Sequence, residues 1–196
     1  YYRRPDEQHG HILSVTEKVM PTVTGDGQHT LEQLILMDRR AVCMAQHYLS
    51  VNKEALPNVL PAGREMKLVE LGTHCRGAIF KDGAWILTPA LEEVFDIICR
   101  SFDGFYFGRY DVITPCVDDL RRGENFKIVE LNGVTSEATH IYEPANSLLT
   151  AYRVLFRQWR LAFEIGAANR SRGHAPAGAR ELLRLLRTFR RPPEAV

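Results

Sequence analysis

The sequence lacks closely spaced cysteines, and this absence excludes two kinds of protein. Its four cysteines are scattered along the chain, with no Cys-x-x-Cys pair and no His/Cys cluster at the spacing of a zinc site (Cys43, Cys75, Cys99 and Cys116). Neither a structural zinc domain nor a small disulfide framework fits this pattern. We therefore expect reduced thiols and a cytoplasmic location.

Long apolar runs and an excess of one charge are also missing. No stretch approaches the roughly 20 consecutive apolar residues that a helix needs to cross a bilayer. The 25 basic residues are matched by 24 acidic ones, which leaves a formal net charge of +1. Nothing global therefore indicates a nucleic acid or a membrane as a partner, and we expect neither.

Arginine is concentrated near the end of the chain, where it recurs from Arg153 to Arg191. Such a basic segment can contact nucleic acid or lipid. A solvated helical face has the same composition, and it is the interpretation that we favour.

Apolar residues alternate in some segments, as in strands, and recur every three to four residues in others, as in helices. This pattern predicts an α+β fold with an antiparallel sheet flanked by helices. Extended segments are expected within 1–23, and strands over 67–71, 76–80, 105–114 and 126–132. Helices are expected over 31–37, 39–49, 88–103, 145–170 and 178–190, and loops over 52–66, 115–125 and 133–144. The long helix 145–170 is expected to bury a stripe that contains Phe156, Trp159 and Phe163.

Two of the expected strands, GRYDV and KIVELNG, keep charged and amide side chains at alternate positions. Arg109 and Asp111 share one face of the first strand, and Glu130 and Asn132 share one face of the second. If the strands pair as a hairpin, the register can bring Asp111 beside Glu130 and Asn132. Two carboxylates and an amide oxygen suit Mg²⁺ when the ion also holds phosphates. Arg109 adds a cation that can clamp a phosphoryl oxygen.

Two other interpretations of these residues stay open at this point. Arg109 can form a purely structural ion pair with Asp111 or Glu130. A two-metal nuclease or phosphodiesterase uses similar carboxylates, but it usually needs further acidic residues or histidines, and these do not cluster in the sequence.

The same two strands resemble the C-terminal core of the ATP-grasp superfamily, in which an R-x-D and an E-x-N on neighbouring strands hold magnesium ions. The segment KVMPTVTGDGQHTLEQLI is similar to the P-x-V-x-GDG-x-(H/S)-T-x-x-(E/Q)-L-I segment of the cyanophycin synthetase and bifunctional glutathione synthetase branches. Both segments stand in the family's order. The resemblance implies an ATP-grasp C-terminal lobe with ATP and Mg²⁺ as cofactors, Mn²⁺ being an alternative ion.

The resemblance implies a role for each matched residue. Asp111, Glu130 and Asn132 match the metal ligands, and Asn132 also matches the nucleotide-binding set. Arg109 matches the catalytic arginine that contacts the nucleotide and the transferring phosphate. We interpret Lys18, in the second segment, as an exposed strand residue, with substrate contact as the alternative.

Five further residues are candidates for substrate contact. Thr135 and Ser136 fall in the loop that holds the acceptor substrate in the family, although this loop lacks the Pro-Gly common in relatives. His74, Arg76 and Arg4 are candidate cations for the carboxylate of a substrate. Exposed side chains with ordinary hydrogen bonds explain these three equally well.

The activity that the resemblance implies is that of an ADP-forming carboxylate–amine ligase. Such an enzyme transfers the γ-phosphoryl group of ATP to a carboxylate, and an amine then displaces phosphate from the acylphosphate. Its partners are small-molecule carboxylates and amines, and the family also allows a homodimer. The alternative is a non-catalytic ATP-grasp remnant that binds a nucleotide or a partner.

The phosphate-binding lysines, the lid and the adenine hinge of the family's first lobe have no counterpart in the sequence. We therefore expect residues 1–170 to form the C-terminal part of an ATP-grasp core, without the N-terminal lobe and the lid. Residues 171–196 are expected to form a C-terminal helix and tail.

Overall fold

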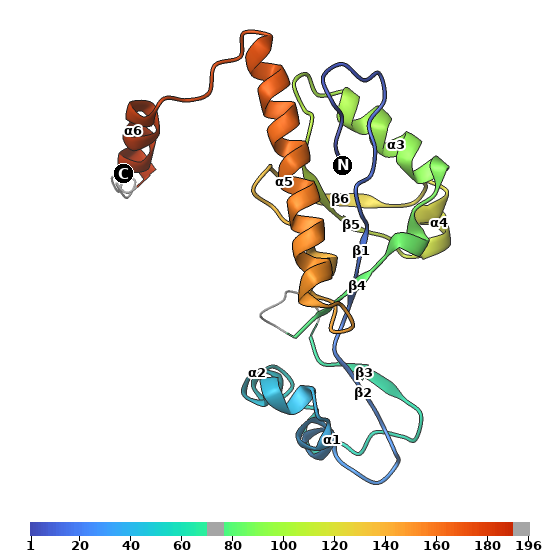
Figure 1. Cartoon of the computed structure of the whole chain (residues 1–196). Helices are drawn as coiled ribbons and strands as arrows, with labels where there is room; N and C mark the ends of the chain where they lie inside the picture. Colours follow the sequence, from blue (N-terminus) through green and yellow to red (C-terminus); the bar gives the residue numbers. More distant parts are fainter. Residues whose placement is uncertain (70–76, 190–196) are drawn as a thin grey trace, which may run out of the picture.

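The computed structural model describes residues 1–69 and 77–189 and has an α+β fold (Figure 1). Its strands form antiparallel pairs: β1 (Thr16–Val19) with β4 (Ile79–Asp82), β2 (Thr22–Thr24) with β3 (Glu65–Lys67), and β5 (Arg109–Ile113) with β6 (Lys127–Asn132). The predicted fold class is confirmed, but the sheet is divided into pairs. One reason is Pro21, which separates β1 from β2 and has no N–H to donate to a ladder.

The first of two hydrophobic cores lies between the β2–β3 pair and α1 (Leu31–Met37), η1 (Ala41–Met44) and α2 (Ala45–Val51). Helix α1 begins where the sequence predicts, because Thr30 and Gln33 form a capping box. The helix expected over 39–49 is divided into η1 and α2. The buried members of this core are Val23, Leu31, Ile35, Ala41, Tyr48, Leu60, Leu68 and Val69.

The second core lies between α3 (Pro89–Arg100), the short elements η3 (Ala84–Ile86) and α4 (Val117–Arg121), and one face of the β5–β6 hairpin. Phe95 of α3 stacks on Phe126, with ring centroids 5.3 Å apart, and meets the Tyr110 ring edge-on at 5.5 Å. Helix α4 lies in a segment expected to be a loop. It forms because Leu120 is buried in this core while two aspartates occupy its first turn, where the helix dipole favours negative charge.

The N-terminal residues form a strap across α3. Tyr2 bridges to His11 and to Phe107, and the strap is fastened by the buried carboxylate of Asp96. Its Oδ1 accepts hydrogen bonds from the Tyr1 hydroxyl and the Gly10 N–H, both at 2.8 Å. From the strap the chain runs into β1 (Figure 1), which lies close to β5 because Lys18 of β1 contacts Asp111.

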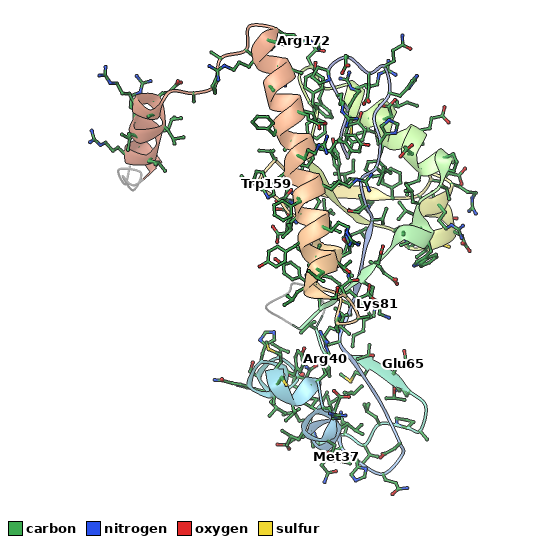
Figure 2. All side chains as sticks on the ribbon, viewed as in Figure 1. Met37, Arg40, Glu65, Lys81, Trp159 and Arg172 are labelled. Atoms are coloured by element: carbon green, nitrogen blue, oxygen red, sulfur yellow. The ribbon has the colours of Figure 1, made fainter. Side chains whose placement is uncertain are left out.

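The long helix α5 (Leu148–Ser171) follows η4 (Thr139–Tyr142) and lies beside the β5–β6 hairpin (Figure 1). The expectation that its aromatic stripe is buried is wrong. Phe156, Trp159 and Phe163 are 73%, 51% and 77% exposed, and in Figure 2 Trp159 projects from the side of α5 away from α3. The helix instead packs through the opposite side, where Gln158, Leu161 and Ile165 are buried.

The last described helix, α6 (Ala179–Phe189), stands apart from the rest of the chain (Figure 1). Four of its leucines are exposed to about half of their area (Leu182, Leu183, Leu185 and Leu186). None of the helices in the described part of the chain combines the length and the hydrophobicity needed to cross a bilayer.

Candidate functional site

The β5–β6 hairpin brings the four charged and amide residues into two facing pairs. Its antiparallel register places Arg109 opposite Asn132 and Asp111 opposite Glu130. The register then shifts, because Val112 pairs with Ile128 and the intervening residue of β6 forms a bulge. The polar pairs therefore occupy one end of the hairpin, and the bulge separates them from its apolar end.

The orientation of the polar pairs follows from the packing of their neighbours. Tyr110 and Val112 alternate with Arg109 and Asp111 along β5, and both pack against the second core. Burial raises the pKa of the Tyr110 phenol, and its contact with the Cys99 thiol, 3.4 Å away, adds to the shift. Tyr110 is thus a neutral anchor that turns Arg109 and Asp111 to the opposite face.

Asp111 is held between two cations. The Nε of Arg109 lies 3.2 Å from its Oδ1, and the Nζ of Lys18 lies 2.6 Å from its Oδ2. The Asp111 side chain is only 15% exposed. Arg109 is anchored further by an Nη1 hydrogen bond of 3.3 Å to the carbonyl oxygen of Glu137. The ion pair between Arg109 and Asp111 that the sequence left open is therefore present, and Lys18 joins it.

Lys18 is a residue that the sequence analysis undervalued. It lies on β1, and its backbone pairs with Phe80 of β4, not with either strand of the hairpin. Only the packing of two separate strand pairs brings its ammonium to Asp111. The local signal was limited to the alternation of side chains along β1, which does not say what each face contacts.

Glu130 and Asn132 complete the polar face. Glu130 is exposed, and Asn132 is half-buried. The side-chain nitrogen of Asn132 is buried, and no hydrogen-bond partner for it lies among the described residues. A buried amide nitrogen without a partner is destabilising, and because protein atoms cover it, no ligand reaches it in this conformation. The donor set of two carboxylates and one amide fits Mg²⁺ with a bound phosphate.

The loop after β6 is fastened to α5 by one buried side chain. Gln158, which is 2% exposed, donates from Nε2 to the carbonyl oxygen of Ser136 and accepts from the N–H of Ala138, both at 2.9 Å. The Ser136 hydroxyl donates to the carbonyl oxygen of Gly133 at 2.7 Å, and Thr135 is exposed. Gln158 was not predicted from the sequence, although a polar residue on the packed face of a helix is a usable signal.

The remaining candidates for substrate contact lie elsewhere or outside the described residues. Arg4 forms ion pairs with Glu7 and with Glu164 of α5, both at 3.1 Å, so its guanidinium is already engaged between the strap and α5. His74 and Arg76 fall within residues 70–76, outside the described part of the chain.

In the described ranges 1–69 and 77–189, the arrangement of acidic, histidine and cysteine side chains singles out no metal site, at the hairpin or elsewhere. These ranges contain no group of three or more His, Cys, Asp and Glu side chains placed to hold a metal ion. Open hollows of about 560 and 440 Å³ lie beside η1 and α2 and at the C-terminal end of α5, away from the polar pairs. The polar pairs themselves lie on an open face of the hairpin.

Comparisons with known proteins bear on the fold. No protein-family model matches the chain, and no curated protein sequence matches it. Among solved structures, the chain is similar to the crystal structure of a bifunctional glutathione synthetase from Pasteurella multocida, with a TM-score of 0.50 and 15% sequence identity. The match covers 78% of this chain and 23% of that chain, so it spans less than a quarter of that protein. At this identity the likeness concerns the fold alone.

Proposed function

We propose that the chain carries the metal- and phosphate-binding part of an ATP- and Mg²⁺-dependent ligase that joins a carboxylate to an amine. The proposed reaction passes through an acylphosphate and forms ADP. The observation that carries the proposal is the register of the hairpin, which sets Asp111 opposite Glu130 and Arg109 opposite Asn132. The similarity in fold to a bifunctional glutathione synthetase adds support, because the name of that protein denotes a ligase.

The metal would be held by Asp111, Glu130 and the side-chain oxygen of Asn132. When bound, Mg²⁺ supplies neutralisation of the phosphate charge and a fixed geometry for phosphoryl transfer. The side-chain nitrogen of Asn132 is a donor that would bind a phosphate oxygen only once the protein atoms that cover it move aside. One amide would thus serve both the metal and the nucleotide.

Arg109 would stabilise the charge on the phosphoryl group as it moves. Its guanidinium is oriented by Asp111 on one side and by the carbonyl oxygen of Glu137 on the other. A cation fixed before the reaction stabilises developing charge without reorganisation. Phosphoryl transfer depends mainly on positioning and charge, so the absence of an obvious nucleophile at this end of the described hairpin is consistent with the proposal.

The acceptor side of the site would be the loop that Gln158 holds on α5. Thr135 and Ser136 belong to this loop, so they are proposed to contact the carboxylate or the amine. We further propose small-molecule substrates, a cytoplasmic location and, as in the resembling family, a homodimer.

The first test is isothermal titration of MgATP into the full chain and its Asp111→Asn and Glu130→Gln variants. Loss of an outer partner of a metal ligand typically weakens affinity by 10–100-fold, so loss of a ligand should weaken MgATP binding by at least about tenfold. Asp103→Asn, which changes an exposed carboxylate in the turn after α3, is the matched control and should bind as the wild type does.

The outcomes separate the candidate functions. Binding that both variants weaken, followed by ADP release with a suitable acid and amine, supports the ligase. Binding without ADP release in any such mixture supports the alternative of a nucleotide-binding module. A folded chain whose binding of MgATP, or of Mn²⁺ alone, ignores both substitutions contradicts the proposed site.

A further inference from the structure

Both carboxylate oxygens of Asp111 already have a cationic partner. Lys18 lies at Oδ2 and Arg109 at Oδ1, at 2.6 Å and 3.2 Å. Asp111 is also one of the proposed metal ligands. A divalent cation that binds Asp111 must therefore approach an ammonium that contacts the same carboxylate, and two cations at that separation repel each other.

The formal charges of the polar face are balanced. Lys18 and Arg109 contribute two positive charges, and Asp111 and Glu130 contribute two negative ones. A bare divalent cation would leave an excess of positive charge on this face. A cation that arrives with a triphosphate would not, because that complex is itself anionic. The charge balance therefore favours the metal–nucleotide complex over the bare metal.

The two cations differ in how firmly they are held. Arg109 has a second anchor in the carbonyl oxygen of Glu137. Among residues 1–69 and 77–189, the side-chain partner of the Lys18 ammonium is Asp111 alone, and the side chain of Lys18 is 38% exposed. The backbone of β1 is fixed by its pairing with β4, so the flexible stem of the lysine can swing its ammonium without disturbing a sheet. Lys18 is thus the cation that can leave.

We propose that Lys18 is an exchangeable counter-ion of Asp111, which competes with a bare divalent cation and yields only to one that brings anionic phosphates. In this role Lys18 is a positioning residue that couples metal binding to nucleotide binding. When the metal complex binds, the ammonium leaves Asp111 and pairs with the added negative charge. The inference rests on the proposed metal site and deepens it.

The test is the affinity for Mn²⁺ alone and for a preformed Mn²⁺ complex of a non-hydrolysable ATP analogue. Both are titrated into the full chain and into Lys18→Met, which keeps the stem length and removes the charge. For Lys18→Met we expect bare Mn²⁺ to bind about tenfold more tightly, and the Mn²⁺ complex of the ATP analogue to bind about tenfold more weakly. Changes of this size are typical when one of two contacting groups is removed. A merely structural role of Lys18 does not reverse the sign between the two ligands.

Lys81→Met is the matched control. Lys81 lies on the neighbouring strand β4, opposite Glu17 and on the other face from Lys18. It should change neither affinity. Circular dichroism melting of each variant confirms that the folded chain is being compared.

The failure of this inference can be told from the failure of the proposed function. If Asp111→Asn and Glu130→Gln leave Mn²⁺ affinity unchanged, the metal site itself is refuted. If those variants weaken Mn²⁺ binding while Lys18→Met leaves bare Mn²⁺ affinity unchanged or lowers it, the site stands and the counter-ion role of Lys18 is overturned.

Discussion

Helices α3 and α5 carry apolar residues at the same helical spacing, yet they place them in different environments. On α3, Leu91 and Phe95 are buried in the second core, and Cys99 is buried beside the Tyr110 hydroxyl. On α5, the larger stripe of aromatic residues is exposed, and the helix packs through Gln158, Leu161 and Ile165. The same period therefore describes a face that is buried in one helix and open in the other.

The difference shows that periodicity identifies an apolar face but not what covers it. Helix α3 is followed by a hairpin whose aromatic residues pack back onto it, since Phe126 and Tyr110 both contact Phe95. Helix α5 is fastened to the rest of the chain by polar contacts, from Gln158 to the loop after β6 and from Glu164 to Arg4. Its stability in this chain depends less on apolar burial than that of α3.

The largest expected difference between the two helices is in the free energy of unfolding lost when one phenylalanine on each helix is truncated. Phe95→Ala should reduce the free energy of unfolding by about 3–5 kcal/mol, because it leaves a cavity beside two aromatic rings. Phe163→Ala, at a side chain that is mostly exposed, should change it by less than about 0.5 kcal/mol. Urea unfolding followed by circular dichroism measures both.

Equal losses of unfolding free energy in the two variants would contradict this difference, because they would mean that the aromatic stripe of α5 is packed in solution. If Phe95→Ala does not fold, Phe95→Leu with a smaller loss serves the same purpose, and Phe163→Leu becomes its partner.

The second expected effect concerns the acidic residues that fasten each helix. Burial opposes the ionisation of Asp96 on α3, but hydrogen bonds from Gly10, His9 and Tyr1 outweigh it and hold the pKa of Asp96 below its usual value of 3.8. The resulting stabilisation is complete above the unfolded pKa and is lost as pH falls through the folded pKa. Asp96→Asn should therefore cost about 2 kcal/mol at pH 7, because charge-assisted hydrogen bonds are lost.

Unfolding measured between pH 7 and pH 2 checks this prediction, and the gap between Asp96→Asn and wild type should narrow below pH 4. Glu164→Gln on α5 is the counterpart. Its hydrogen bonds with Arg160 and Arg4 lower the pKa of Glu164, but salt screens such exposed pairs, so the effect should be smaller and should fade in high salt. A gap for Asp96→Asn that stays constant with pH contradicts the charge-dependent role of Asp96.

The smallest expected effect comes from the caps of the two helices. Thr88 accepts the N–H of Leu91 and also donates to the carbonyl oxygen of Arg121 at the end of α4. Ser147 accepts the N–H of Thr150 at 3.2 Å. Thr88→Ala should cost about 1–2 kcal/mol and Ser147→Ala about 0.5–1 kcal/mol, because only Thr88 joins two elements. Thermal melting of the two variants measures these costs. A larger loss of stability in Ser147→Ala than in Thr88→Ala would contradict the prediction.

Much of the local structure could be predicted from the sequence. The N-caps at Thr30 and Thr88 were readable because the capping residue and the helix that it starts are adjacent in the chain. The strands β5 and β6 were readable from their alternation. The short helix α4 was not, because its single turn depends on Leu120 finding the second core, which no local pattern shows.

The sequence by itself determined that Arg109 and Asp111 share one face of β5 and that Glu130 and Asn132 share one face of β6, because alternation along a strand is a local property of the backbone. The register of the hairpin decided that these two faces coincide. Only the tertiary structure decided that Lys18 reaches Asp111, that Gln158 holds the loop after β6, and that the aromatic face of α5 stays open. Each of these depends on segments far apart in the chain, and spacing within one segment carries no information about the surface that packing brings against it.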